Sequence, residues 1–197
     1  MNDIAPPINH LAGLLRGVPE NGAAPVERWH PPYCGDIGLA IRADAVWEYR
    51  GSPIGRPALV KLFARVLRRD ADGRTYLVTP AEKVDVTVAD APFLAVEMAV
   101  QADGRGQEIT FRTNVDDLVP LGPEHPLRIA RDAAGGLKPY VRVRGRLEAL
   151  LTRALTYDLA ELTVEVGDAL GVWSRGRFFE LEPNSREARP DSASTTR

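Results

Sequence analysis

The chain has few of the residues from which most catalytic and metal centres are built. It holds one cysteine and three histidines in 197 residues, so an internal disulfide is excluded and a clustered zinc site is not expected. Aromatic residues make up 7% of the chain, and the formal net charge is only -2. A chain with this balance has no general attraction for polyanions, so nucleic-acid binding would need a local basic patch and is not predicted.

Long apolar runs are also missing. The most apolar segments are interrupted by Lys61, Arg65 or Arg153, and none approaches the roughly 18 apolar residues that a membrane-spanning helix needs. No basic-then-apolar leader is visible at the start. We therefore expect a cytoplasmic protein without a membrane span. The hydrophobic content of 44% is enough to bury a sizeable core.

The two ends differ from the middle in composition. Residues 1–28 are rich in proline, glycine and alanine, and we interpret them as an N-terminal extension. Residues 183–197 hold no non-proline apolar residue larger than alanine, which predicts a disordered tail. Between them we expect two small domains, at residues 29–100 and 101–182.

In the first predicted domain, strand signals surround one helix. Apolar runs at 37–41 and 46–49 predict a hairpin. Pro57 suits a first helical turn, and apolar residues then recur at helical spacing, so we expect a helix that continues through Arg69. A meander of antiparallel strands is predicted at 75–78, 84–88, 93–100 and 108–113.

A similar order of signals follows Gly135-Gly136. Residues 140–144 alternate as a strand, Gly145 follows, and apolar residues from Leu147 to Leu155 share one helical face. Three more strands are predicted at 159–166, 170–174 and 177–181. The predicted fold class is therefore α+β, with two small domains built from a repeated strand-helix-antiparallel-strand unit near 45–115 and 138–181. The same order can also recur by chance in α+β proteins.

Few residues carry a catalytic signature. Cys34 lies in no nucleophile motif, and Ser52 lacks the Gly-x-Ser-x-Gly pattern of a nucleophile elbow. Gly104-Arg105-Gly106 does not lead into a helix as a phosphate loop would, and Asp116-Asp117 lacks the further carboxylates of a calcium loop. Ordinary turn and core roles explain these residues better. No cofactor and no metal is predicted.

Basic residues gather in two places. The first set lies on the predicted first helix and the second around the second strand-helix unit: Lys61, Arg65, Arg68 and Arg69, then Arg142, Arg144, Arg146 and Arg153. Exposure to solvent explains both sets, although an anion or an acidic partner could use either. If the side of the strand that carries Arg142 and Arg144 faced another domain, each would need a carboxylate or a ligand anion.

The loops around the first helix favour a polar ligand. Arg56 precedes the proline that begins this helix, and Thr79-Pro80-Ala81-Glu82-Lys83 forms a connection fixed by proline. A guanidinium, a hydroxyl, a carboxylate and an ammonium that converged there would suit a small polar ligand or a peptide carboxylate. An ordinary hairpin loop explains the same residues equally well.

The same segments carry a family resemblance. The motifs are Cys34-Gly35-Asp36-Ile37, Trp47-x-Tyr49-x-Gly51-Ser52-Pro53-Ile54-x-Arg56, Leu59-Val60-Lys61-Leu62-Phe63-x-x-Val66-Leu67-Arg68, Tyr76-Leu77-Val78-Thr79-Pro80-x-Glu82-Lys83, Asp90-x-Pro92-Phe93, Phe111-x-Thr113-Asn114, His125-Pro126-Leu127 and Pro139-Tyr140-Val141-x-Val143-Arg144. With them the chain resembles the bacterial domain of unknown function 1285 family over about residues 30–180. The family pattern leads us to expect Asp-Gly at the first hairpin turn, where this chain has Asp44-Ala45. Because alanine resists positive φ, a longer loop is expected there.

The resemblance implies a fold and a general role. It implies a two-domain α+β protein with a repeated motif, whose second domain is similar to a pleckstrin-homology barrel. It also implies a ligand site at the domain interface and a signalling or regulatory role without a known ligand.

We predict a non-enzymatic binding module that takes a small polar or anionic ligand, or an acidic partner, between its two domains. The predicted polar lining is Arg56, Thr79, Glu82, Lys83, Asn114 and Arg144, with Trp47 and Tyr49 as apolar walls. Two alternatives stay open. One is an acid-base enzyme that uses Glu82 with Lys83, and the other is a protein-interaction module that uses sheet edges or the basic helix face.

Overall fold

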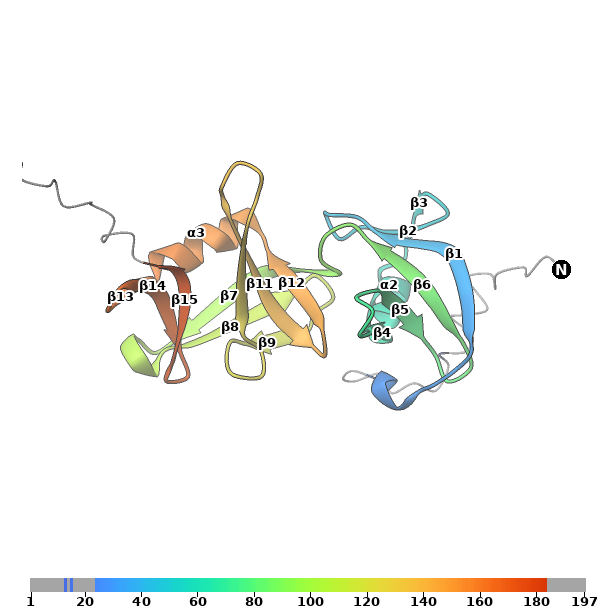
Figure 1. Cartoon of the computed structure of the whole chain (residues 1–197), viewed down its shortest axis with the longest axis horizontal. Coiled ribbons are helices and arrows are strands. Elements are labelled where there is room, and N and C mark those ends of the chain that lie inside the picture. The colour runs from blue at the N-terminus through green and yellow to red at the C-terminus, as the bar shows by residue number, and fades with distance from the viewer. Residues whose placement is uncertain (1–12, 14, 16–23, 184–197) are drawn as a thin grey trace, which may run out of the picture.

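The computed structural model describes residues 13, 15 and 24–183 of the chain. Two mostly β domains lie beside each other along the long axis of the molecule (Figure 1), and each contains one of the two α-helices that lie within residues 24–183. Most of the predicted N-terminal extension, residues 1–28, and all but residue 183 of the predicted tail, residues 183–197, lie outside the described residues. Of the extension, residues 13, 15 and 24–28 are described, and Ala24 and Val26 are buried.

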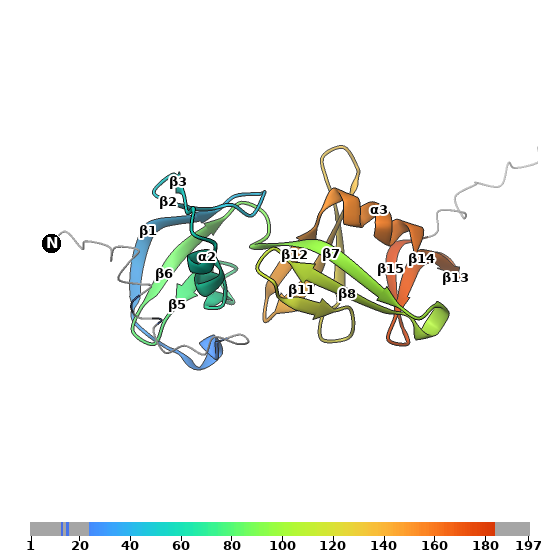
Figure 2. The same ribbon diagram turned by 180° about the vertical axis from the view of Figure 1, so that it is seen from behind.

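The first domain is a six-stranded sheet with one helix. Its elements are the short 3-10 helix η1 (Val26–Arg28), β1 (Tyr33–Ile41), β2 (Trp47–Tyr49), β3 (Ser52–Pro53), α2 (Pro57–Ala64), β4 (Leu67–Arg69), β5 (Thr75–Val78) and β6 (Lys83–Val88). The strand order is β3-β2-β1-β6-β5-β4, and only the central pair, β1 with β6, is parallel. Helix α2 buries Leu59, Phe63 and Ala64. It lies between its sheet and the second domain in both views (Figures 1 and 2).

The second domain contains a six-stranded sheet, a three-stranded sheet and one helix. Its elements are β7 (Phe93–Gln101), η2 (Gly104–Gly106), β8 (Glu108–Thr113), β9 (Leu118–Pro120), β10 (Leu127–Arg131), β11 (Leu137–Arg144), β12 (Leu147–Leu151), α3 (Arg153–Glu161), β13 (Val164–Val166), β14 (Ala169–Ser174) and β15 (Arg177–Pro183). The larger sheet has the order β10-β11-β12-β7-β8-β9, and again only its central pair, β12 with β7, is parallel.

The two large sheets have the same topology. Read from β9 to β10, the second sheet runs β9-β8-β7-β12-β11-β10, which repeats the order of the first sheet strand for strand. The helices do not follow this correspondence, because α2 lies between β3 and β4 whereas α3 follows β12. The strand-glycine-helix order predicted for the second domain is wrong, because Gly145 and Arg146 lead into strand β12 and not into a helix.

Both predicted helices have different bounds in the structure. Helix α2 begins at Pro57 but ends at Ala64, since Leu67–Arg69 leave it to pair with β5. The N–H of Val78 donates to the Val66 carbonyl at 3.0 Å, which draws this segment into the sheet. In the second domain Leu147–Leu151 form β12, and the helix begins at Arg153. Leucines four residues apart fit both the helical and the strand period, so their spacing alone could not decide.

The boundary between the domains also differs from the prediction. The first sheet ends at Val88 and β7 belongs to the second sheet, so the crossing lies at residues 89–92 rather than near residue 100. The predicted meander is interrupted here, because β6 pairs with β5 and β1 but not with β7. The first hairpin forms as predicted, with a loop at 42–46. Ala45 in this loop nevertheless has a φ of 58°.

Polar contacts join the two domains at several points. The Lys61 ammonium of α2 binds Asp116, and the Arg144 guanidinium binds the carbonyl of Ala64 at the end of α2. At the crossing, Asp90 accepts hydrogen bonds from Lys138 at 2.6 Å and from the hydroxyl of Tyr140 at 2.7 Å. These contacts join α2 and the crossing at residues 89–92 to the second domain.

Candidate functional site

A cleft of about 560 Å³ lies between the two domains. The first domain contributes the β4–β5 turn, residues 69–73, and the second contributes residues of β10, β11 and β12 and of the turn that joins the last two. The charged residues among them are Arg69, Asp70, Arg128, Arg142, Arg146 and Glu148. The volume is within the range of small-molecule sites, about 300 to 1,000 Å³.

The two carboxylates of the cleft are already paired with cations. Glu148 accepts hydrogen bonds from Arg128 at 2.6, 2.9 and 3.1 Å, and this raises the pKa of the Arg128 guanidinium. Asp70 accepts hydrogen bonds from Arg68 at 2.6 Å and from Lys83 at 3.3 Å. Burial alone would raise the pKa of Asp70, but these two hydrogen bonds outweigh it and lower the pKa. Neither carboxylate is left to neutralise another arginine.

Three arginines of the cleft have no carboxylate partner among residues 24–183. Arg142 and Arg146 are exposed and make no side-chain hydrogen bond or ion pair within this range. Arg69 donates from Nε to the carbonyl of Gly73 at 3.0 Å, which leaves its charge uncompensated. A planar guanidinium binds carboxylate or phosphate through two parallel hydrogen bonds. The cleft therefore presents positive charge from both domains to an anion.

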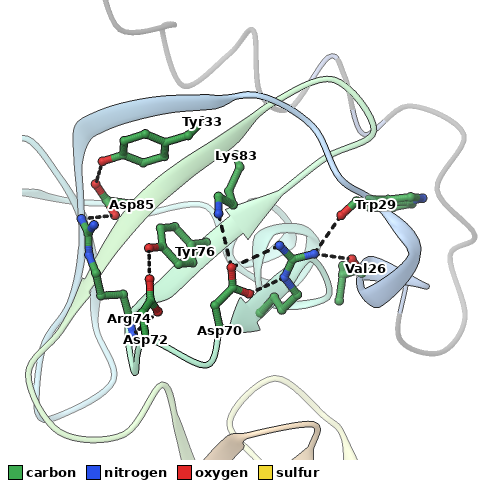
Figure 3. A network of polar contacts seen from close by, with 10 residues as sticks. Val26, Trp29, Tyr33, Asp70, Asp72, Arg74, Tyr76, Lys83 and Asp85 are labelled. Atoms are coloured by element: carbon green, nitrogen blue, oxygen red, sulfur yellow. Dashed lines mark hydrogen bonds and ion pairs between the residues drawn. The ribbon is translucent and has the colours of Figure 1, made fainter.

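A polar network holds the β4–β5 turn in place (Figure 3). Besides Asp70, the Arg68 guanidinium binds the carbonyls of Val26 and Trp29, at 2.8 and 2.9 Å. The hydroxyl of Tyr76 donates to Asp72 at 2.6 Å, and this bond raises the pKa of Tyr76 to about 12. Both ends of the turn are thus tied to buried or half-buried groups, so that Arg69 projects from a fixed backbone.

The same network continues along the sheet. Arg74 donates to Asp85 at 2.6 Å, and the same carboxylate accepts a hydrogen bond from the Tyr33 hydroxyl. The Lys83 ammonium lies 4.3 Å from the centre of the Tyr76 ring. Arg74 directly precedes β5, and the other residues come from β1, β5 and β6 (Figure 3).

The predicted apolar walls serve other purposes. Trp47 is 2% exposed and its ring lies 6.2 Å from that of Phe63, so it belongs to the core of the first domain. Tyr49 is half-buried with the Arg50 guanidinium 5.2 Å from its ring. Arg56 is exposed and comes directly before α2. None of the three lines the interdomain cleft.

The predicted loop residues hold their own turn. Thr79 is fully buried, and its hydroxyl oxygen accepts from the N–H groups of Ala81 at 3.2 Å and Glu82 at 2.9 Å. Glu82 lies in this turn and does not line the cleft. Lys83 takes part indirectly, through its hydrogen bond to Asp70.

The predicted residues of the second domain are structural. The side-chain oxygen of Asn114 accepts from the Leu94 N–H at 3.0 Å, which fixes the loop after β8 to β7. Arg144 binds Asp117 at 2.7 Å and the carbonyl of Ala64. Since α2 has 8 residues at about 1.5 Å each, Arg56 and Arg144 lie at opposite ends of a helix about 12 Å long. They therefore do not share one site.

The cleft arginines were visible in the sequence as two basic sets but were not placed in the predicted lining. The apolar spacing predicts a helix through Arg69, although α2 ends at Ala64, and Arg142 and Arg146 stand beside Arg144 in the sequence. Their meeting depends on the contact between two turns far apart in the chain. Two turns, Asp70–Gly73 and Gly145-Arg146, lie beside arginines in the sequence, and these turns are the feature from which the cleft could have been predicted.

Other kinds of site find no support in the described part of the chain. No group of three or more histidine, cysteine, aspartate or glutamate side chains is placed to hold a metal ion there. The thiol of Cys34 donates to the Pro32 carbonyl at 3.6 Å. Within the same residues, neither α-helix has the length and apolar character needed to cross a bilayer.

Two family models together match residues 24–181. One is described as "Domain of unknown function (DUF1285), N-terminal domain" and matches residues 24–91; the other, "Protein of unknown function (DUF1285), C-terminal domain", matches residues 92–181. The chain belongs to the DUF1285 family. The two models meet where the chain crosses between the sheets.

Solved structures of DUF1285 proteins are similar to this chain. A DUF1285 family protein from Silicibacter pomeroyi DSS-3 is 45% identical, with a TM-score of 0.82 over 88% of this chain and 94% of the other. A second, from Shewanella baltica OS155, is 27% identical, with a TM-score of 0.50 over 63% of this chain and 91% of the other. No curated protein matches the chain.

Proposed function

We propose that this DUF1285 protein is a cytoplasmic binding module that holds a small anionic ligand in the cleft between its two domains. One observation carries the proposal: Arg69, Arg142 and Arg146 have no carboxylate partner among residues 24–183, while both carboxylates of the same cleft are occupied. A ligand carboxylate or phosphate would supply the missing negative charge. Each charge-assisted hydrogen bond contributes on the order of 1.5 to 3 kcal/mol.

Because the cleft lies between the two domains, anion binding would affect how the domains are arranged. Arg69 belongs to the first domain, and Arg142 and Arg146 to the second, so a bound anion favours the arrangement in which the two turns are close. This linkage supports the proposal of a signalling or regulatory role. The shared order of the two large sheets supports a duplication of one ancestral unit, and the helix beside the curved second sheet supports the proposed likeness to a pleckstrin-homology barrel.

Calorimetric titration with inorganic pyrophosphate tests the proposal. The protein should bind it at an ionic strength held constant with chloride, and a variant with both Arg142→Ala and Arg146→Ala should bind at least about tenfold more weakly, since about 1.4 kcal/mol is a factor of ten. Arg153→Ala is the matched control, because Arg153 is also an exposed arginine of the second domain but its hydrogen bonds go to Tyr157. Equal affinity in the double variant, or no binding by the parent protein, would refute the proposal.

The enzyme and protein-interaction alternatives are less well supported. Glu82 and Lys83 do not line the cleft, and Lys83 is committed to Asp70. Lys61 on the helix face is bound to Asp116 of the second domain, so it already serves a contact within the chain.

A further inference from the structure

A second, smaller cavity borders the basic cleft. It has a volume of about 200 Å³, and Arg69, Gly145 and Arg146 line both spaces. Its other apolar walls are Ala24, Val26, Leu67 and Leu147, and its other charged lining residues are Glu27, Arg68 and Arg144. All four apolar residues are buried or nearly so, at 0 to 6% exposure. The basic cleft therefore borders a largely apolar compartment.

From these shared lining residues we infer that the ligand is an amphiphilic anion, with its acidic group among the cleft arginines and a short apolar group in the compartment lined by Ala24, Val26, Leu67 and Leu147. The inference rests on the proposed function and adds the chemical class of the ligand. The compartment binds the apolar part of the same molecule, because Gly145 and Arg146 of the β11–β12 turn line both spaces.

The charges fix the direction in which such a ligand enters. Glu27 lines the apolar compartment, and its carboxylate oxygen lies 3.3 Å from the point where a Cβ on Gly145 would be. Arg68 and Arg144 also line the compartment, but their guanidinium groups are bound to Asp70 and Asp117. The Glu27 carboxylate repels an anionic group, so the acidic end stays beside Arg142 and Arg146. The ligand therefore has one acidic end and one apolar end.

The compartment also limits the length of the apolar group. At about 30 Å³ for each water-sized group, 200 Å³ holds roughly six or seven such groups. A chain of about four to six carbons fills it, whereas a long acyl chain would extend into solvent. The class is thus a short-chain or small-ring acid or phosphate rather than a membrane lipid.

Titration with a series of alkyl phosphates tests this inference on the full-length protein. Affinity should rise roughly fourfold with each added methylene from methyl to butyl phosphate. It should gain nothing further between hexyl and dodecyl phosphate. A flat series, or a rise that continues to dodecyl phosphate, would overturn the inference, and the latter result would point to a lipid.

A variant that fills the compartment provides the second measurement. Ala24→Ile should keep its affinity for inorganic phosphate but lose the advantage of butyl phosphate, while Ala99→Ile on the exposed part of β7 should behave like the parent protein. An undiminished butyl advantage in Ala24→Ile would show that the apolar group lies elsewhere. If inorganic phosphate does not bind at all, the proposed function fails; if it binds without a gain from chain length, only this inference fails. The alkyl series in the parent protein decides the question even if Ala24→Ile does not fold.

Discussion

Replacing Arg144 with methionine is expected to weaken the joint between the two domains. The Arg144 side chain is 18% exposed, and its guanidinium binds Asp117 at 2.7 Å, binds the carbonyl of Ala64 and lies 5.1 Å from the Phe93 ring. Methionine keeps much of the volume but removes both hydrogen bonds. It also removes the cation from the C-terminal end of α2, where positive charge is favourable.

The size of the effect follows from these contacts. Each of the two charge-assisted hydrogen bonds contributes about 1.5 to 3 kcal/mol, and water can replace part of this where Asp117 is exposed. We therefore expect the free energy of unfolding to fall by about 2 to 4 kcal/mol. Urea denaturation followed by far-ultraviolet circular dichroism measures this change, and a second transition would show that the domains unfold separately.

The control for this experiment lies on the same strand. Arg142 is exposed and has no side-chain partner in the described range, so Arg142→Met is expected to change stability by no more than about 0.5 kcal/mol. The reasoning would be refuted if Arg144→Met and Arg142→Met unfolded at the same urea concentration. It would also be refuted if the loss in Arg144→Met were fully restored by Arg144→Lys, which cannot reproduce the forked geometry.

Two further predictions concern stability. A Cβ on Gly171 would lie 2.3 Å from the Phe179 carbonyl oxygen, so Gly171→Ala should lower the melting temperature by many degrees, whereas Gly106→Ala, with open space around it, should change it little. The pKa of Asp70 is lowered from its ordinary value of 3.8 in the folded state, so the stability that Asp70 contributes is present above that pH and is lost as the pH falls through the folded pKa. In acid titrations of unfolding, Asp70→Asn should therefore be less stable than the parent at pH 7 and should lose less stability below pH 4; parallel curves would contradict this.

Local pattern predicted many elements but not their partners. Strands at 75–78 and 108–113 have the predicted bounds, because alternating or β-branched residues identify a strand without reference to the rest of the chain. The two parallel central pairs, β1 with β6 and β7 with β12, join segments far apart in sequence, and no local period reports such pairing. Local periodicity therefore favoured a meander of neighbouring antiparallel strands, which the parallel pairs interrupt.

The candidate site could be predicted only in part. An interdomain site for an anion was expected, and two of the cleft arginines stand beside Arg144 in the sequence. Thr79 and Asn114 were placed in the lining because polar loop residues are common in binding sites, but the same side chains also satisfy backbone groups in turns, as they do here. Arg69 is the clearest omission, since its position depends on where α2 ends.

The order of the strands along the chain has a consequence for synthesis. All six strands of the first sheet lie between residues 33 and 88. They therefore emerge from the ribosome before β7, the first strand of the second sheet, has fully emerged. The cleft, by contrast, needs Glu148 and Arg146, and these emerge only after most of the second sheet. A nascent or truncated chain that presents a complete first sheet still lacks the arginines of the second domain. Anion binding in this cleft would therefore report on chains that extend beyond Glu148 and not on shorter fragments.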